Sequence, residues 1–530
     1  MRVGLDIGSS SAKAILVDGS GRARKTARRT FPTRRDGQRV EHDAERIVGA
    51  TIGALEDLAP ALPRGAAVPL GFASQRSTFL FWDRSSGRPL TPAISWQDLR
   101  AAGINRAARR RAARRGLDVG GVTGLRPSAH YAAPKISWAL ANLPGLRRRI
   151  AAGTALWGTL TTYVVWRLTR GGVYAVDHAN AQRTSLMDLA ALAWEPRLFE
   201  LYGLEPLLDA PALPALTPTC LSAPIEFAAG ARRVALLAVT GDQQAALVGL
   251  RCRRLGDMAI NYGSGAFVLR CVGTTPLRRR GLLTTLVSSR WTLPPIDMRR
   301  DGARRHDGLV AIFALEGPVN AAATAIDWVA ARMHRSVHTA DLDRLLGPWD
   351  PGARRALHFL PAVAGLAAPH WDEKAKPRFV GQVKGTGLAP RMRAAVEAIA
   401  QRCAEIALAA GESPARARRA DRDGDARSAG RAGGRRSSGA PVRVSGGLTR
   451  CRYLLQAQAD LLGRAVAVTE TRDATGVGAA LLAAPIPPGH DRGGHGGETI
   501  LEPIATPARS ASLRRSWSRA VYRGGAAPSI

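Results

Sequence analysis

Cysteine is scarce in this sequence, and the five that occur are scattered and form no Cys-x-x-Cys pair. An odd number of isolated cysteines argues against a disulfide framework or a zinc site, and is typical of a reducing compartment. No uninterrupted apolar run is long enough to span a membrane. The N-terminus also lacks the charged and apolar regions of a signal peptide. We therefore expect a cytoplasmic protein without a membrane span.

Lysine and aromatic residues are also few. Aromatic residues make up 5% of the chain, and the net charge of +34 comes almost entirely from arginine. Such a bias is typical of a GC-rich genome, although a basic surface would also bind nucleic acid non-specifically. The densest arginine run, residues 106–115, has no aromatic residue near it for base stacking. We interpret the run as a solvated helix face and expect no specific nucleic-acid partner.

Two common nucleotide-binding motifs are absent. The sequence contains neither Gly-x-x-x-x-Gly-Lys-Ser/Thr nor Gly-x-Gly-x-x-Gly. Their absence excludes a P-loop nucleotide-binding domain and a Rossmann dinucleotide-binding domain. With 530 residues and 45% hydrophobic content, the chain is nevertheless long enough for two or three globular domains.

The sequence is organised around the stretch at residues 234–249, VALLAVTGDQQAALVG. Its first half predicts a buried strand, and a helix-like run follows from Gln244. Asp242 lies between them, where a carboxylate can either cap the helix or face a ligand. Capping is the commoner role for a lone Asp. Whether Asp242 caps the helix or contacts a ligand therefore depends on the motifs in the rest of the chain.

Two glycine-rich hairpins open the two halves of the sequence. Residues 3–17, VGLDIGSSSAKAILV, form a strand, a Gly-Ser turn and a second strand, and residues 258–269, MAINYGSGAFVL, repeat the pattern. Backbone N–H groups in such turns converge on anions, so both turns are candidate phosphate sites. A third glycine turn, in VRVSGGLT at residues 442–449, precedes another helix.

Together, these motifs resemble the FGGY carbohydrate kinases, and within that family the glycerol kinases most closely. Further similarity lies in residues 71–98, 313–329 and 359–372, so that the resemblance covers most of residues 1–485. It implies an α/β chain with the two-domain actin-like ATPase (ribonuclease H-like) fold and an active site in the interdomain cleft. It also implies phosphorylation of a hydroxyl group on a small polyol or sugar, with ATP and Mg²⁺.

The resemblance assigns roles by position. Asp242 matches the catalytic base, and Asp6 the residue associated with the metal. The substrate residues are Arg76, Ser77, Trp96, His130, Asp242 and Gln243. The nucleotide residues are Ser9, Ser10 and Lys13 in the first phosphate turn, Gly263, Ser264 and Gly265 in the second, and Gly446 and Gly447 beside adenine.

Two substrate positions depart from the glycerol kinases. Ser77 stands where these enzymes have Glu, and His130 stands where they have Tyr. We therefore expect a larger acceptor than glycerol, or a different pattern of hydroxyl groups. Arg76 could instead pair with Asp98 or Asp83, and Trp96 could be a core residue. The alternative function is a catalytically impaired kinase-fold protein with a non-specific nucleic-acid-binding surface.

The domain limits follow from the same comparison. We expect an N-terminal kinase domain at 1–249, a C-terminal kinase domain at 250–485, and a linker with a basic tail at 486–530. Residues 409–441 contain no apolar side chain larger than Ala or Pro and are dominated by Arg, Asp, Gly and Ser. Such a composition predicts a flexible insertion. A homodimer and a homotetramer both stay open.

Overall fold

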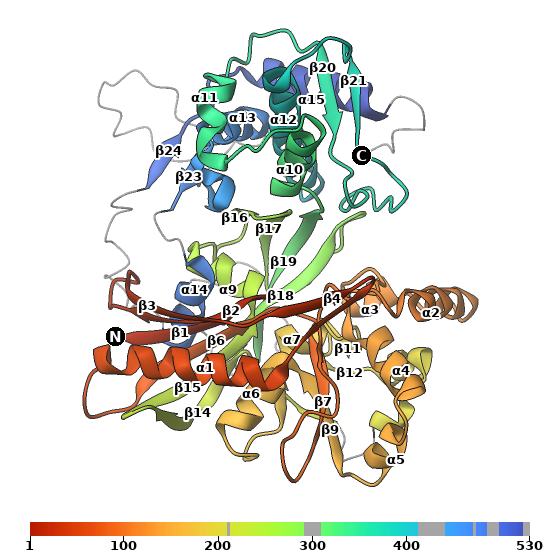
Figure 1. Ribbon diagram of the computed structural model, residues 1–530, viewed down its shortest axis with the longest axis vertical. Coiled ribbons are helices and arrows are strands. Elements are labelled where there is room, and N and C mark those ends of the chain that lie inside the picture. Colours follow the sequence, from red (N-terminus) through yellow and green to blue (C-terminus); the bar gives the residue numbers. More distant parts are fainter. Residues whose placement is uncertain (209–212, 291–308, 412–439, 470–472, 485–497, 523–530) are drawn as a thin grey trace.

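The computed structural model describes residues 1–208, 213–290, 309–411, 440–469, 473–484 and 498–522. These residues form two α/β units, one above the other in Figure 1. Most of the insertion expected at 409–441 lies outside the described residues. Within the described part, no helix is both long and apolar enough to cross a membrane.

The first unit is built on a six-stranded sheet in the order β14-β15-β6-β1-β2-β3. Its strands are β1 (Arg2–Ile7), β2 (Ser11–Val17), β3 (Ala23–Thr30), β6 (Val68–Ser74), β14 (Cys220–Ala229) and β15 (Arg232–Gly241). β1, β6 and β15 are parallel, whereas β1 and β2 form the expected antiparallel hairpin. Nearly every residue of these parallel strands is buried, because helices cover both faces of the sheet.

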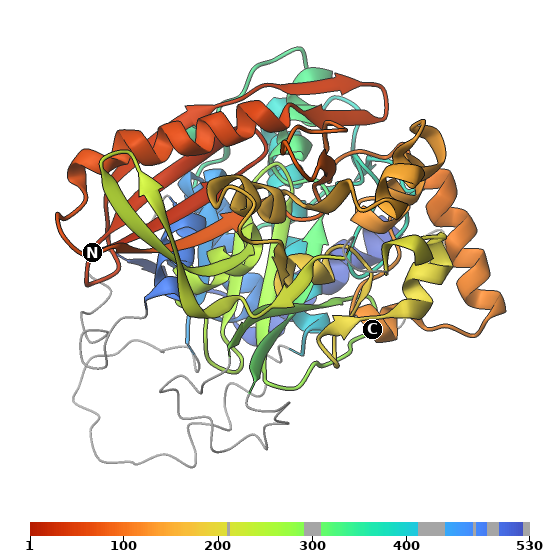
Figure 2. The same cartoon turned by 90° about the horizontal axis from the view of Figure 1, so that it is seen from below.

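A second sheet and several helices extend this unit. The sheet contains β4 (Thr33–Asp36), β5 (Arg39–His42), β8 (Ala93–Ile94), β7 (Phe79–Asp83) and β9 (Ala155–Thr159). The main helices are α1 (Ala44–Leu58), α2 (Ala102–Arg114), α4 (Ala132–Asn142), α6 (Leu160–Leu168) and α8 (Pro196–Tyr202). α2 lies at the outer edge of the molecule (Figure 2) and exposes most of the predicted arginine run, as expected for a solvated helix face.

The second unit repeats the plan of the first around a seven-stranded sheet. In order, its strands are β18 (Leu283–Arg290), β19 (Val310–Val319), β17 (Ala266–Gly273), β16 (Met258–Tyr262), β22 (Val442–Gly446), β23 (Val466–Val468) and β24 (Thr499–Leu501). β16 pairs antiparallel with β17 and parallel with β22, as β1 does with β2 and β6. α10 (Ala323–Arg332), α12 (Leu388–Ala409) and α13 (Arg452–Leu462) pack in this unit. The chain therefore has the expected two-domain actin-like fold.

The described part of the expected linker and tail contributes to the second unit. β24 pairs with β23, and α15 (Pro507–Tyr522) packs against the domain. Leu513, Trp517 and Val521 recur at four-residue intervals, so one apolar face of α15 is buried. The backbone carbonyl of Leu513 also accepts a hydrogen bond from Gln401. Residues 498–522 are therefore packed structure, whereas 485–497 and 523–530 lie outside the described residues.

Two helices connect the units at very short range. α9 (Asp242–Gly249) follows β15, and α14 (Ala474–Ala483) lies against it while also covering β1 and β6. A Cβ atom on Gly478 would lie 1.7 Å from the carbonyl oxygen of Ala245, and one on Gly71 would lie 1.8 Å from that of Ala479. Glycine is therefore required where these elements cross, because any side chain would push them apart.

We expect Gly478→Ala to lower the melting temperature by roughly 2–12 °C. Overpacking of this kind costs about 1–3 kcal/mol, and each kcal/mol corresponds to about 2–4 °C in a large domain. Thermal unfolding followed by circular dichroism measures the effect. Gly49→Ala is the matched control, because Gly49 lies exposed in α1 and its added Cβ would contact nothing within 4 Å. Equal melting temperatures for the two variants would show that the α9–α14 contact is not tight.

Candidate active site

Three parallel strands of the first unit end in register at one edge of their sheet. Ser74, the last residue of β6, pairs with both Ile7 of β1 and Gly241 of β15. In parallel α/β sheets this carboxyl edge is where ligands bind. Arg76 and Asp242 follow two of the strand ends, and the register therefore brings the two side chains together.

Asp242 is the first residue of α9, as the sequence predicts. The N-cap of the helix is Gly241, so the Asp242 carboxylate does not cap it. Oδ1 accepts a hydrogen bond from the backbone N–H of Gln243 at 2.8 Å and lies 3.3 Å from Nε of Arg76. Oδ2 has no such partner among the described residues, and the side chain is 28% exposed. Burial raises the pKa of the carboxyl group, and the charge of Arg76 offsets this only in part.

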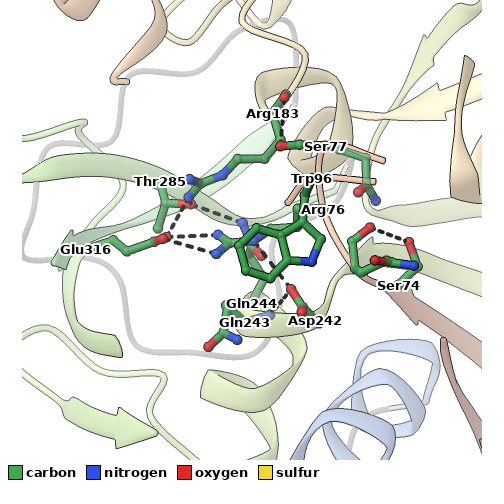
Figure 3. Close-up of polar contacts among 12 residues, drawn as sticks. Ser74, Arg76, Ser77, Trp96, Arg183, Asp242, Gln243, Gln244, Thr285 and Glu316 are labelled. Atoms are coloured by element: carbon green, nitrogen blue, oxygen red, sulfur yellow. Dashed lines mark hydrogen bonds and ion pairs between the residues drawn. The ribbon is translucent and has the colours of Figure 1, made fainter. Parts of the chain in front are cut away.

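Arg76 is held by a buried carboxylate from the other unit (Figure 3). Its Nη1 and Nη2 donate to the two oxygens of Glu316 on β19, at 2.9 and 3.1 Å. Arg183 donates to the same carboxylate at 2.5 Å and to Thr285 Oγ1 at 2.7 Å. Burial opposes ionisation of Glu316, but Arg183 and Arg76 outweigh it and lower its pKa to about 2. The site is therefore anchored across both units.

The predicted substrate residues lie close to this centre. Trp96 Nε1 donates to Ser9 Oγ at 3.3 Å, and Nδ1 of His130 lies 3.0 Å from the Trp96 carbonyl oxygen. Ser77 is buried in the left-handed region (φ 65°), and its hydroxyl group donates to the carbonyl oxygen of Arg183 at 3.1 Å (Figure 3). The structure thus links the Ser9 turn, Trp96 and His130, whereas the Ser77 hydroxyl group binds the backbone.

Two further groups complete this side of the site. Oε1 of Gln243 is buried and has no hydrogen-bond partner among the described residues. A buried acceptor without a partner is costly, and a ligand hydroxyl group could satisfy it. The guanidinium group of Arg76 lies 5.9 Å from the ring centre of Phe267 on β17, a residue that the sequence interpretation did not select.

The first glycine turn carries acidic and basic groups. Lys13 does not project freely but forms a 2.8 Å ion pair with Asp473, just before α14. Burial raises the pKa of Asp6 to about 7; Lys13 opposes the shift, while Asp242 and Asp473 add to it. The side chain of Ser10 is exposed. A cation bound near Asp6 would favour the ionised form of its carboxyl group.

The second glycine turn lies beside the third. The backbone N–H of Gly263 donates to the carbonyl oxygen of Gly265 at 2.8 Å, and Ser264 is exposed between them. Tyr262 of β16 pairs with Gly446 of β22, so the two turns end adjacent strands. A Cβ atom at Gly446 would lie 2.1 Å from the Tyr262 carbonyl oxygen, and its φ is 99°. Gly447 follows with open space around it.

The alternative partners expected for Arg76 are engaged elsewhere. Asp98 binds Arg100, and Asp83 binds Arg149. Neither carboxylate pairs with Arg76. Arg76 pairs instead with Asp242 and Glu316, and the pairing with Glu316 was not foreseen. Its role in binding the substrate stays a prediction.

The sequence interpretation missed three charged residues of the site, namely Arg183, Glu316 and Asp473. Glu316 lies inside the quoted segment 313–329, where a lone acidic residue in an apolar strand is a usable signal because such a residue needs a buried partner. Arg183 and Asp473 carry no comparable local signal.

Comparison with known proteins identifies the family to which both halves of the chain belong. Residues 1–249 match the N-terminal domain of the FGGY family of carbohydrate kinases, and residues 258–485 match its C-terminal domain. The chain is 33% identical to a glycerol kinase of Halorhodospira halophila, covering 98% of this chain and 95% of the relative, and 34% identical to one of Thermus brockianus, covering 98% and 97%.

A solved structure of Plasmodium falciparum glycerol kinase with ADP superposes with a TM-score of 0.79 at 22% identity, covering 98% of this chain and 97% of the other, which supports the fold. Both halves of the chain thus match the family, and the sequence similarity extends over nearly its whole length. The chain therefore belongs to the FGGY family of carbohydrate kinases and is an ATP-dependent enzyme of that family.

Proposed function

We propose that Asp242 is the general base of this kinase and takes the proton from the hydroxyl group that is phosphorylated. The observation that carries the proposal is the asymmetric pairing of its carboxylate. Arg76 and the Gln243 N–H both contact Oδ1, so Oδ2 is the oxygen open to an acceptor. A raised pKa also makes the carboxylate a stronger base than an ordinary Asp.

The reaction is a direct transfer between two oxygens. As the acceptor O–H gives its proton to Asp242, its oxygen bonds to the γ-phosphorus of ATP, and the bond from that phosphorus to the β,γ-bridging oxygen breaks. ADP leaves with the electron pair. Positioning and charge neutralisation provide most of the catalysis in such transfers.

The glycine turns are proposed to hold the nucleotide. The turn at Ser9 and Ser10 would contact the ATP phosphates from the first unit, and the turn at 263–265 would contact them from the second. Gly446 and Gly447 would lie beside the adenine ring. A Mg²⁺ ion would neutralise phosphate charge, and Asp6 would hold it through water. Asp6 fits that role because burial, with a smaller contribution from the Asp242 and Asp473 carboxylates, disfavours its ionised form, and a nearby cation would favour that form. The described residues contain no group of three or more His, Cys, Asp or Glu side chains that could hold a metal ion.

The acceptor is proposed to be a small polyol or sugar other than glycerol. Trp96 offers an apolar face, while Arg76 and Gln243 offer groups for hydroxyls. The Ser77 hydroxyl group is already bound to the Arg183 carbonyl oxygen, so it does not replace a carboxylate that would accept from two substrate hydroxyls.

We expect an acceptor panel to favour a longer molecule. Each unpaired substrate hydroxyl costs about 1–3 kcal/mol, so kcat/KM for glycerol should be roughly 5- to 150-fold below that of the best acceptor. The measurement is ADP release with glycerol, four- and five-carbon polyols, ketoses and aldoses. If glycerol ranks first, the proposed acceptor is wrong. If no acceptor releases ADP, the impaired-kinase alternative takes the place of the proposed function.

A further inference from the structure

Lys135 of α4 is a fully buried cation that binds only backbone in the described structure. Its side chain is 0% exposed. Nζ donates to the carbonyl oxygens of Ser95 at 2.8 Å, His130 at 2.9 Å and Ser77 at 3.4 Å. An ammonium group has three N–H donors, so the three carbonyls use all of them. Burying a charge without a contacting carboxylate is costly, and the cost calls for an explanation.

The three carbonyls come from three segments that are distant in the sequence. Ser77 follows Arg76, and Ser95 precedes Trp96. The third carbonyl belongs to His130 itself. Each segment carries a side chain of the proposed acceptor pocket, and one ammonium group joins all of them. The Ser77 segment also has the left-handed backbone (φ 65°) that costs free energy unless its surroundings hold it.

We propose that Lys135 is a positioning residue for the acceptor pocket, which it shapes by tying together the backbone at Ser77, Ser95 and His130. The inference rests on the proposed function, because it takes these segments to form the acceptor site. Lys135 touches no reacting atom in this role. It fixes where Arg76, Trp96 and His130 stand relative to one another.

The arrangement makes the pocket depend on one proton. A neutral amine has two N–H donors and a lone pair, so one carbonyl loses its partner and faces that lone pair. Burial lowers the pKa of Lys135 to about 7; the carboxylate of Asp98 opposes the shift and Arg100 adds to it. The imidazole of His130 also lies near, with Nδ1 at the Trp96 carbonyl oxygen. Above pH 7, therefore, Lys135 donates one hydrogen bond fewer to the backbone of the pocket.

Deprotonation of Lys135 affects the stability of the fold in the opposite direction to its effect on acceptor binding. The unfolded chain keeps Lys135 protonated up to a pKa of about 10.4, whereas the folded chain loses the proton near 7. Between these values the unfolded state binds more protons, so the contribution of Lys135 to the free energy of unfolding rises with pH. Weaker acceptor binding in this range cannot then be attributed to unfolding caused by Lys135.

The test is the pH dependence of KM for the best acceptor of the panel. In the wild type we expect KM to rise about 2- to 10-fold between pH 6 and 8.5, the effect of one lost hydrogen bond, with kcat changed less. Lys135→Met should show a high KM that lacks the part of this rise that depends on Lys135, because that titrating group is gone. Asp6 also titrates near 7 and is present in both proteins. The part of the pH dependence of KM that is due to Lys135 is therefore the difference between the wild-type profile and that of Lys135→Met. Lys25→Met, at an exposed position of β3, should behave as the wild type.

A wild-type profile identical in shape to that of Lys135→Met would overturn the proposal, whether or not Asp242 is the base. If Lys135→Met does not fold, hydrogen–deuterium exchange on the wild type replaces it. After correction for the intrinsic rate, amides at 76–78, 94–97 and 128–131 should lose protection together between pH 6 and 8.5. Unchanged protection in these segments would also overturn it.

Discussion

Asp242→Asn should lower kcat by roughly 10²–10⁴-fold, the usual contribution of a general base. The amide has the same shape as the carboxylate and can still accept from the Gln243 N–H and from Arg76, but it cannot take the proton from the acceptor. Binding of nucleotide should be largely retained, because the glycine turns that are proposed to bind the phosphates are untouched. Steady-state ADP release measures turnover, and calorimetric titration with ADP measures binding.

The matched control is Asp43→Asn. Asp43 caps α1 by accepting hydrogen bonds from the N–H groups of Glu45 and Arg46, and Asn caps helices about as well as Asp. Turnover should be unchanged in this variant. Near-normal turnover in Asp242→Asn would remove Asp242 from the role of base. A parallel loss of ADP binding would instead indicate that the substitution disturbed the cleft.

The local secondary structure around the candidate site residues could be predicted from the sequence. The strand–helix junction at Asp242 and the glycine turns at 8–10, 263–265 and 446–447 all lie where short apolar runs meet turn residues. These signals involve neighbours in the chain, so no knowledge of the tertiary structure was needed. The duplicated hairpins also indicated the two-unit plan correctly.

The charge network could not be predicted because its partners are remote. Arg76 and Glu316 are 240 positions apart and come from different units, and Lys13 is 460 positions from Asp473. Nothing in the sequence around Arg76 distinguishes Glu316 from the nearer Asp83 and Asp98. Only the register of the sheets decides between them. The burial of residues in the tail was equally hard to predict. Trp517 is buried only because the apolar face of α15 packs against the second unit, and the sequence does not show that contact.

Glu316→Gln should be the most destabilising change in the site. The substitution keeps the size of the side chain but removes the negative charge between two buried guanidinium groups, Arg76 and Arg183. Breaking a buried ion pair by removing one partner costs about 3–5 kcal/mol, because the remaining charge is left uncompensated. The melting temperature should fall by roughly 6–20 °C at about 2–4 °C for each kcal/mol.

The control is Glu226→Gln, which removes one partner of the exposed pair between Glu226 and Arg233. Surface pairs contribute about 0–1 kcal/mol, so its melting temperature should change by a few degrees at most. Since the pKa of Glu316 is about 2, lowered from its ordinary 4.5, the stabilisation it provides is present above about pH 4.5 and is lost only as the pH falls through 2. The deficit of Glu316→Gln should therefore be the same at pH 6 and pH 8.

The catalytic consequence separates Glu316 from an ordinary core residue. Without the carboxylate, repulsion from Arg183 should drive the guanidinium group of Arg76 toward Asp242, the nearest remaining negative charge at 3.3 Å. A closer Arg76 lowers the pKa of the Asp242 carboxyl group and makes it a weaker base. At temperatures where the variant is still folded, kcat should fall and the acid limb of its pH profile should move to lower pH than in the wild type. A variant that is destabilised but keeps the wild-type pH profile would show that Glu316 holds the two units together without tuning the base.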